Sequence, residues 1–257
     1  MRIAFTRAEK LAAQPTLFLH GNLASSKWWE LALAEWRKAG SQGPHDLIFA
    51  DWRGCGQNPQ WPKDKNFTLE DLAQDGPELL ESLKLENVAL VGHSLGGLIA
   101  LQMMILAPGL FSKAVLLDPV GVKGVVFDDS MYEAFRQMAL SEQLTATVIL
   151  STVAGSESLP ESFKKDIIKD AFHAVQGIGT SVLEILKTVD LRSQVARLKI
   201  PTLILHGRGD AIIPVGDSEA TAKLMPTSQL EIVECGHCWN VERPAGFVRR
   251  IRDWLKA

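Results

Sequence analysis

The sequence has 257 residues, of which 46% are hydrophobic and 22% charged, and its mean hydropathy is +0.05, which is ordinary for a soluble globular protein. The formal net charge of -3 gives no electrostatic reason to expect nucleic acid or an anionic membrane as a partner. Three cysteines are too few for a disulfide framework, so we expect a reducing, cytoplasmic compartment.

No apolar run reaches the roughly 18 residues that a membrane-spanning helix needs. Charge also interrupts the first seven residues, Met1 to Arg7, too early for the apolar region of a signal peptide. We therefore expect no membrane partner. The length suits one substantial hydrophobic core.

Short apolar segments alternate with longer amphipathic segments along most of the chain, which is typical of β-α-β units around a parallel sheet. The predicted strands cover residues 2–6 (an edge strand), 16–20, 46–51, 87–93, 114–119, 201–206 and 229–234. The predicted helices cover residues 28–39, 69–83, 95–106, 217–224 and 244–255, and Thr68 with Asp71 resembles a capping box before the second of them. The fold class is therefore α/β, with a mostly parallel twisted sheet flanked by helices.

Residues 120–190 break this alternation. They contain no convincing strand and predict helices at residues 131–140, 143–151, 160–175 and 181–189, separated by glycines. A segment of this length is too long for a simple connection between a strand and a helix. We therefore expect a helical cap at 120–190, inserted into a core formed by residues 1–119 and 191–257.

The strongest chemical signal is Gly92-His93-Ser94-Leu95-Gly96, which matches the motif G-x-S-x-G between a predicted strand and a predicted helix. The glycines leave room for a sharp turn that exposes the serine hydroxyl beyond the end of the sheet. The first turn of the following helix directs its N–H groups and the positive end of its dipole to the same place. Ser94 is therefore the candidate nucleophile.

A serine hydroxyl needs a base to take its proton, and the chain has six histidines to supply one. His237 directly follows the last predicted strand, which places it on a loop at the carboxyl edge of the sheet. His93 is adjacent to Ser94 in sequence, but the turn directs the two side chains apart. We therefore expect His237 to be the general base.

The third member of such a site is a carboxylate that orients the histidine. Asp210 ends the stretch Leu205-His206-Gly207-Arg208-Gly209-Asp210 and gives the chain order Ser, Asp, His. Asp118, at the end of the strand before Pro119, is the alternative, although an aspartate there is equally suited to a turn. We prefer Asp210.

An acyl-transfer intermediate also needs hydrogen-bond donors for its negatively charged oxygen. The backbone N–H of Leu95, next after the serine, should be one donor. The loop after residues 16–20 should supply the other, because Gly21 permits an unusual backbone path there. We expect the second donor to be the N–H of Asn22, with the N–H of Leu23 as the alternative.

Together these residues resemble the α/β-hydrolase superfamily, and the resemblance covers essentially the whole chain. It rests on five stretches in family order: His20-Gly21-Asn22 with Ser25 and Trp28 beyond it, Asp51-Trp52-Arg53-Gly54-Cys55-Gly56, Gly92-His93-Ser94-Leu95-Gly96-Gly97, Gly207-Arg208-Gly209-Asp210, and Gly236-His237. The chain also resembles the small capped esterases, lactonases, perhydrolases and carbon–carbon bond hydrolases of that superfamily. This resemblance implies a pocket between cap and sheet.

Two further comparisons with the superfamily concern the start of the chain and the nucleophile. Only nineteen residues precede His20, which is short for the two-stranded hairpin that usually opens the fold, so the presence of its first strand stays open. Ser94 occupies the position where the dehalogenase and epoxide-hydrolase branches carry an aspartate, and it excludes those branches.

Two weaker patterns bear on binding roles. Trp28, Trp29 and Trp239 lie near the predicted site and are candidate substrate contacts, although tryptophan is ordinarily a packing residue. Cys235-Gly236-His237-Cys238 contains C-x-x-C, but no second cluster completes a zinc site, and the pattern lacks the fold context of a redox pair. We expect no metal, and without a Gly-rich dinucleotide loop we expect no cofactor.

The preferred function is hydrolysis of a small, largely apolar carboxylic ester or lactone through an acyl-Ser94 intermediate. The first alternative is hydrolysis of a carbon–carbon bond in a ring-cleavage product, which needs a cationic or polar group for the substrate carboxylate; the candidates are Arg53, Arg136, Arg192 and Arg208. The second alternative is a non-catalytic receptor for a small ligand. The sequence does not determine the substrate, the acceptor of the acyl group or the oligomeric state.

Overall fold

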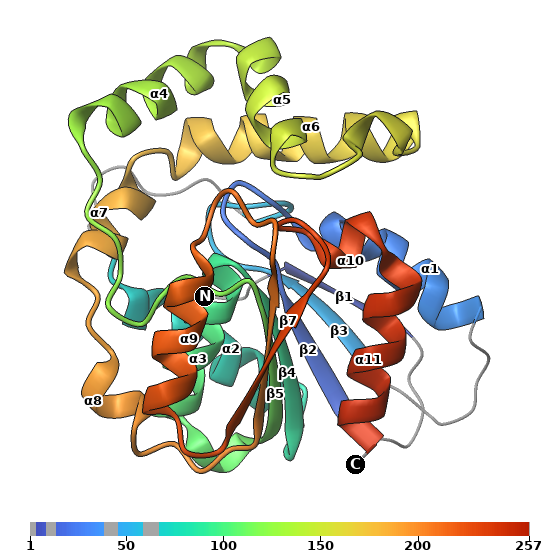
Figure 1. Ribbon diagram of the computed structural model, residues 1–257, viewed down its shortest axis with the longest axis vertical. Helices are drawn as coiled ribbons and strands as arrows, with labels where there is room; N and C mark the ends of the chain where they lie inside the picture. The colour runs from blue at the N-terminus through green and yellow to red at the C-terminus, as the bar shows by residue number, and fades with distance from the viewer. Residues whose placement is uncertain (1–3, 9–13, 39–45, 59–66, 257) are drawn as a thin grey trace.

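A seven-stranded sheet forms the centre of the molecule in the computed structural model, which describes residues 4–8, 14–38, 46–58 and 67–256 (Figure 1). The strand order is β1-β3-β2-β4-β5-β6-β7, and every neighbouring pair is parallel except β1 with β3. The strands are β1 (Ala4–Ala8), β2 (Pro15–Leu19), β3 (Asp46–Asp51), β4 (Val88–His93), β5 (Phe111–Leu117), β6 (Thr202–Gly207) and β7 (Ser228–Val233). The predicted α/β-hydrolase architecture of the sheet is confirmed.

The amino-terminal edge strand ends two residues later than the sequence predicts, at Ala8. The predicted range, residues 2–6, includes residues 2 and 3, which lie outside the described part of the chain. The strand β1 runs antiparallel to β3 and pairs Phe5 with Ala50. Among the described residues, a single antiparallel strand therefore precedes the parallel part of the sheet, in place of a two-stranded hairpin.

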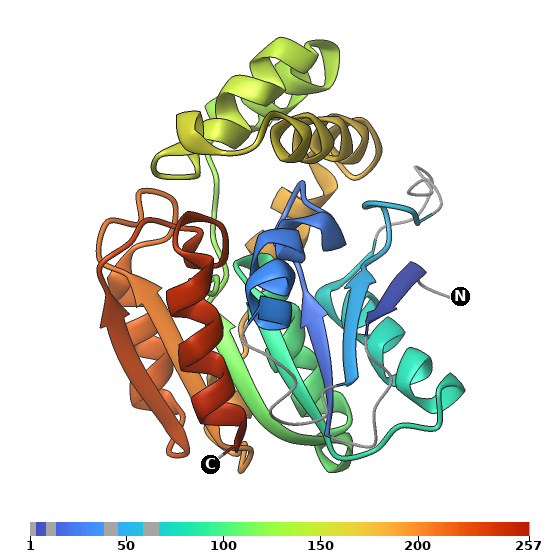
Figure 2. The same cartoon turned by 90° about the vertical axis from the view of Figure 1, so that its right-hand side faces the viewer.

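Helices cover both faces of the sheet. Figure 2 shows α1 (Glu30–Lys38) and α11 (Pro244–Lys256) on one face, and α2 (Leu69–Ser82), α3 (Leu95–Leu106) and α9 (Val215–Leu224) lie on the other. Side chains of β2 alternate between the two faces, because Leu17 and Leu19 join one apolar cluster and Phe18 joins the second. The sheet is thus buried on both sides, as its apolar strands predict.

The starts of two helices show how the local sequence fixes their boundaries. At α2, Thr68 Oγ1 accepts a hydrogen bond from Asp71 N at 3.1 Å and Asp71 Oδ2 accepts one from Thr68 N at 2.8 Å, which confirms the predicted capping box. The helix predicted at residues 28–39 begins as a 3-10 turn, η1 (Ser26–Trp29), before α1; residue 39 lies outside the described residues.

Among the described residues, four α-helices of eight residues or more lie between β5 and β6: α4 (Asp129–Leu140), α5 (Glu142–Ser151), α6 (Glu161–Gly177) and α7 (Ser181–Thr188). Figure 1 shows α4, α5 and α6 as a separate layer beyond the carboxyl ends of the strands, and we call these three helices the cap. A short helix, α8 (Arg192–Val195), leads back to β6. None of the helices in the described ranges combines the length and the apolar character needed to cross a membrane.

Candidate active site

Ser94 lies in the sharp turn between β4 and α3, with φ 54° and ψ -121°. A residue with a side chain rarely adopts this backbone conformation, which persists only where its surroundings enforce it. A β-carbon on Gly92 would lie 2.5 Å from the carbonyl oxygen of Gly96, and one on Gly96 would overlap the carbonyl oxygens of Leu19 and His20. The two glycines of the motif therefore allow the turn to form.

The turn places Ser94 at the carboxyl edge of the sheet. Its backbone N–H donates to Leu117 O at the end of β5, at 2.9 Å. The residue is 7% exposed, so the hydroxyl is largely shielded from bulk water. The amino-terminal end of α3 begins at the next residue, Leu95, and its dipole favours negative charge at this position.

His237 and Asp210 form a hydrogen-bonded pair at the same edge. The distance from His237 Nδ1 to Asp210 Oδ2 is 2.7 Å, and His237 is 6% exposed. An ionised carboxylate only accepts hydrogen bonds, so Nδ1 carries the proton and Nε2 keeps its lone pair. No hydrogen bond joins Ser94 Oγ to His237 among the described residues, and such contacts commonly tighten when substrate binds.

The backbone around Asp210 holds its carboxylate in an ionised form. Oδ1 accepts hydrogen bonds from Ile212 N at 2.7 Å and Ile213 N at 3.0 Å. Burial opposes ionisation, but the hydrogen bond with His237 and these two N–H groups outweigh it, so the pKa of Asp210 is lowered. The side chain can therefore orient and stabilise an imidazolium.

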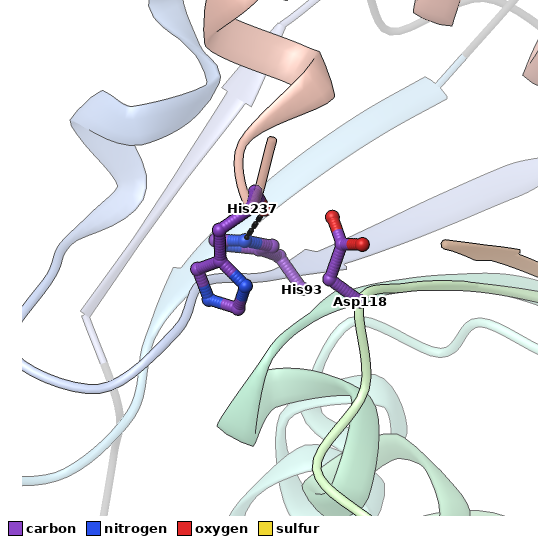
Figure 3. Close-up of side chains that lie close together, drawn as sticks. All are labelled: His93, Asp118 and His237. Atoms are coloured by element: carbon purple, nitrogen blue, oxygen red, sulfur yellow. Dashed lines mark hydrogen bonds between the residues drawn. The ribbon is translucent and has the colours of Figure 1, made fainter. Parts of the chain in front are cut away.

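Asp118, the alternative carboxylate, makes different contacts. Its Oδ1 accepts a hydrogen bond from Gly207 N at 2.7 Å, and its Oδ2 has no partner among the described residues. Burial raises the pKa of Asp118 well above its usual value, which favours the neutral carboxylic acid. Figure 3 shows Asp118 beside His93 and His237 without a bond to either ring. Of the two carboxylates, only Asp210 is hydrogen-bonded to His237.

His93 supports the loop that carries His237. Its Nε2 donates to His237 O at 2.9 Å, and the two ring centroids are 4.8 Å apart (Figure 3). Burial, together with the neighbouring His237, lowers the pKa of His93 to about 3. His93 is therefore neutral near pH 7 and serves as a buried donor to the His237 loop.

A second support of this loop is Glu242, which the sequence pattern does not reveal. Its carboxylate accepts hydrogen bonds from the two N–H groups that flank His237, those of Gly236 at 2.7 Å and Cys238 at 3.1 Å. It also accepts one from Ala154 N of the segment after α5, at 3.3 Å. One carboxylate thus holds both sides of the His237 loop and ties it to the cap region.

The loop that carries the second expected oxyanion donor approaches the nucleophile at Gly21. A β-carbon on Gly21 would be 3.2 Å from Ser94 Cβ, a tighter contact than most side chains make, so glycine favours this close approach of the loop. His20 Nδ1 donates to Gly21 O at 2.8 Å. Because the next peptide unit is planar and trans, the N–H of Asn22 points away from His20. The N–H of Leu23, the alternative donor, is already bonded to Asn22 Oδ1 at 3.0 Å.

The three tryptophans that are predicted to contact substrate are placed differently from one another. Trp28 is 3% exposed and lies near His93, with ring centroids 6.3 Å apart. Trp29 and Trp239 both pack against Phe247 of α11, each at a centroid distance of 6.0 Å. These contacts give Trp29 and Trp239 a packing role, and substrate contact stays a prediction for all three.

In the described part of the chain, two groups of side chains have possible metal-ligand atoms within 4.8 Å of one another: His93, Asp118 and His237, and Asp118, His206 and Asp210. Both ring nitrogens of His206 already have partners, Ser218 Oγ at 2.7 Å and Ile213 O at 3.0 Å. One nitrogen of His93 and one of His237 is engaged as well. The polar atoms are thus arranged mainly as a hydrogen-bonded network.

In the C-x-x-C pattern around His237, Cys238 is buried and Cys235 is half-buried. Burial raises the pKa of both Cys235 and Cys238, and the Cys238 Sγ contacts Thr152 O at 3.5 Å. The thiolate is the form that binds metals and exchanges disulfides, so raised pKa values oppose both reactions here. The two cysteines therefore fit a packing role beside the histidine loop.

Comparison with known proteins finds relatives that match almost the whole chain. A candidate carbamate hydrolase of Pseudomonas savastanoi is 28% identical over 96% of this chain and 95% of its own. A 2-hydroxy-6-oxo-2,4-heptadienoate hydrolase of Pseudomonas putida is 27% identical over 96% of this chain and 90% of its own. The solved esterase of Exiguobacterium antarcticum has the same fold, with a TM-score of 0.82, 21% identity and coverage of 99% of this chain and 96% of its own. The family profile described as alpha/beta hydrolase fold matches residues 14–244, and the chain belongs to this hydrolase family.

Proposed function

We propose that the protein hydrolyses a small, largely apolar carboxylic ester or lactone through an acyl-serine intermediate. Ser94 Oγ attacks the carbonyl carbon while His237 Nε2 takes the hydroxyl proton. The carbonyl oxygen becomes negatively charged and accepts hydrogen bonds from Asn22 N–H and Leu95 N–H. When the tetrahedral intermediate collapses, the bond to the leaving alkoxide breaks and His237 gives its proton to that oxygen.

A water molecule then completes the reaction. His237 Nε2 takes a proton from the water as its oxygen attacks the acyl carbon, and the same two N–H groups hold the second oxyanion. Collapse of this intermediate releases the carboxylic acid and returns the proton to Ser94 Oγ. Asp210 stays ionised throughout and stabilises the imidazolium through Nδ1.

The observation that carries the proposal is the 2.7 Å bond from His237 Nδ1 to Asp210 Oδ2, at the sheet edge where the strained turn presents Ser94. The bond fixes the histidine tautomer that a serine nucleophile needs. The low pKa of Asp210 keeps the negative charge in place at neutral pH. A nucleophile, a base and a carboxylate that orients the base support acyl transfer.

The two relatives differ in the compounds that their names say they hydrolyse. A carbamate, like an ester, has a carbonyl with a heteroatom leaving group, whereas the heptadienoate substrate carries a carboxylate. The four arginines that are candidates for binding such a carboxylate are each paired with an acidic side chain: Arg53 with Asp75, Arg136 with Glu133, Arg192 with Asp190, and Arg208 with Glu234. This pairing supports ester or lactone hydrolysis over the carbon–carbon reaction.

The test is the release of p-nitrophenol from p-nitrophenyl esters of increasing acyl length, with wild type and Ser94→Ala measured side by side. Circular dichroism and thermal unfolding confirm that the variant is folded. We expect turnover by the wild type alone, with a chain-length optimum that reports the size of the pocket. A vinylogous 1,5-diketone and a thermal-shift screen of small apolar ligands are measured in parallel.

Each other result points to a specific alternative. Turnover of the diketone without turnover of esters would replace ester hydrolysis by carbon–carbon hydrolysis. A ligand that raises the unfolding temperature but is never turned over would indicate a receptor. Ester turnover retained by Ser94→Ala would contradict the acyl-serine mechanism itself.

A further inference from the structure

An aspartate of the cap is hydrogen-bonded to the segment that carries the expected oxyanion donor. Asp170, on α6, accepts a hydrogen bond from Ser25 Oγ at 2.7 Å, although the two residues are 145 positions apart in the sequence. Ser25 is 1% exposed and the Asp170 side chain 16% exposed, so water competes weakly for this bond. A hydrogen bond to an ionised acceptor is stronger than one between neutral groups.

Ser25 ends the short segment that begins with Gly21, beside Ser94. Its Oγ also accepts a hydrogen bond from Lys27 N at 3.3 Å, so the hydroxyl links the cap to the start of η1. Within the segment, Leu23 has φ 50°, which is an uncommon conformation for a leucine. A strained backbone keeps its shape only where its surroundings hold it.

The core holds the other parts of this segment. His20 bonds to Gly21 O, and Ser26 N donates to Asp51 Oδ1 at 2.6 Å. Between these two anchors, the described structure shows one side-chain hydrogen bond to the cap, from Ser25 Oγ to Asp170. If it were lost, the buried Ser25 hydroxyl would need a new acceptor, and the segment would be free to shift.

We propose that Asp170 is a positioning residue that fixes the Asn22 N–H for the oxyanion from the cap side. The inference rests on the function proposed above and deepens it, because it makes the cap part of the reaction site. It also implies that the oxyanion site is fully formed only while α6 is seated on Ser25. Asp170 acts through Ser25 and does not touch the reacting atoms.

The chain offers a matched control on the same helix. Asp166 lies one helical turn before Asp170 and binds the same lysine: Lys27 Nζ is 3.4 Å from Asp166 Oδ1 and 3.7 Å from Asp170 Oδ2. Asp166 is 44% exposed and, in the described structure, makes no bond to Ser25. Replacing Asp166 therefore removes a similar charge and leaves the bond to Ser25 intact.

The test measures p-nitrophenyl acetate hydrolysis, inhibition by a trifluoromethyl ketone, and the rate at which a fluorophosphonate phosphonylates Ser94. In Asp170→Ala we expect kcat and the phosphonylation rate to fall about tenfold, because the donor is displaced and not removed. KM should change by less than about threefold, and inhibition by the tetrahedral ketone adduct should weaken about as much as kcat/KM. Asp170→Asn, which keeps an acceptor oxygen, should recover most of the loss, and Asp166→Ala should stay within about twofold of wild type.

Ser25→Ala removes the same bond from its other end. The double variant Ser25→Ala with Asp170→Ala should lose no more activity than the worse single variant, because one bond cannot be lost twice. Multiplied losses, equal losses in Asp166→Ala and Asp170→Ala, or unchanged phosphonylation in Asp170→Ala would each overturn the inference while leaving the proposed function standing. A folded wild type that is never phosphonylated at Ser94 would overturn both.

Discussion

Replacing Asp210 by asparagine changes the proton position on His237 while keeping the shape of the site. Oδ1 of Asp210 accepts from Ile212 N and Ile213 N, and only an oxygen can keep these two bonds. The amide NH₂ of the introduced asparagine must therefore occupy the place of Oδ2, 2.7 Å from His237 Nδ1. Because NH₂ donates, Nδ1 becomes the acceptor and the ring proton moves to Nε2.

This tautomer cannot take the proton of Ser94. In a serine–histidine–aspartate site, the wrong tautomer lowers kcat by about 10⁴-fold. At about 1.4 kcal/mol for each factor of ten, the loss corresponds to roughly 5.5 kcal/mol of transition-state stabilisation. KM should change little, because Asp210 is not expected to contact the substrate.

The assay is the hydrolysis of a p-nitrophenyl ester by wild type, Asp210→Asn and Asp118→Asn. Asp118→Asn is the matched control, because it keeps an acceptor for Gly207 N and replaces a carboxyl whose raised pKa favours its neutral form. We expect Asp118→Asn to retain kcat within about threefold. Loss of activity in Asp118→Asn with retention in Asp210→Asn would show that the wrong carboxylate has been assigned to the histidine.

Three more predictions concern stability and the support of the site. The pKa of Asp118 is higher in the folded protein than in the unfolded chain, so its contribution to stability is fully present below the ordinary carboxyl pKa and is lost as the pH rises towards the folded pKa. Asp118→Asn lacks this titration. Thermal unfolding should therefore show that Asp118→Asn gains stability relative to wild type through this pH window, by about 1.4 kcal/mol for each pH unit. No such gain would contradict the raised pKa. Glu242→Gln places an NH₂ group opposite one of the backbone N–H donors that flank His237, so two donors face each other. Ester kinetics should then show a kcat about tenfold lower than that of the wild type. An unchanged kcat would show that Glu242 does not support His237. Gly96→Ala should lower the free energy of unfolding, measured with denaturant, by at least about 1–3 kcal/mol, because a β-carbon there would overlap backbone atoms. Gly109 has open space around it, so Gly109→Ala should cause no such loss. Equal effects of the two substitutions would contradict the close approach at Gly96.

The sequence predicts much of this architecture because its signals are local. Alternation of apolar strands with amphipathic helices places the sheet and its helices close to their observed bounds. The glycines around Ser94 require a tight turn, and the expectation agrees with the φ of 54°. The Asp210–His237 pair is also foreseeable, because the carboxyl ends of neighbouring parallel strands meet at one edge of a sheet.

The contacts that support the site depend on residues distant in sequence. Asp170 lies in an amphipathic cap helix and is indistinguishable in sequence from a solvated surface aspartate such as Asp166. Glu242 follows His237 by five residues, but its role depends on the short helix α10 (Trp239–Glu242), which returns its carboxylate to the loop. Trp29 illustrates the opposite case, since a tryptophan near the motif residues packs between Phe18 and Phe247. Tertiary packing decides such roles, and one sequence does not show it.

The most direct test of the acyl-serine mechanism is to identify the atom that carries the acyl group. The reaction of the wild type with a slowly hydrolysed p-nitrophenyl ester is quenched in acid, and the protein is analysed by intact mass and peptide mapping. The acyl-serine mechanism predicts one acyl group per chain, on the peptide that contains Ser94, and none in Ser94→Ala. Ester turnover with the acyl group on another residue, or turnover by Ser94→Ala, would contradict it.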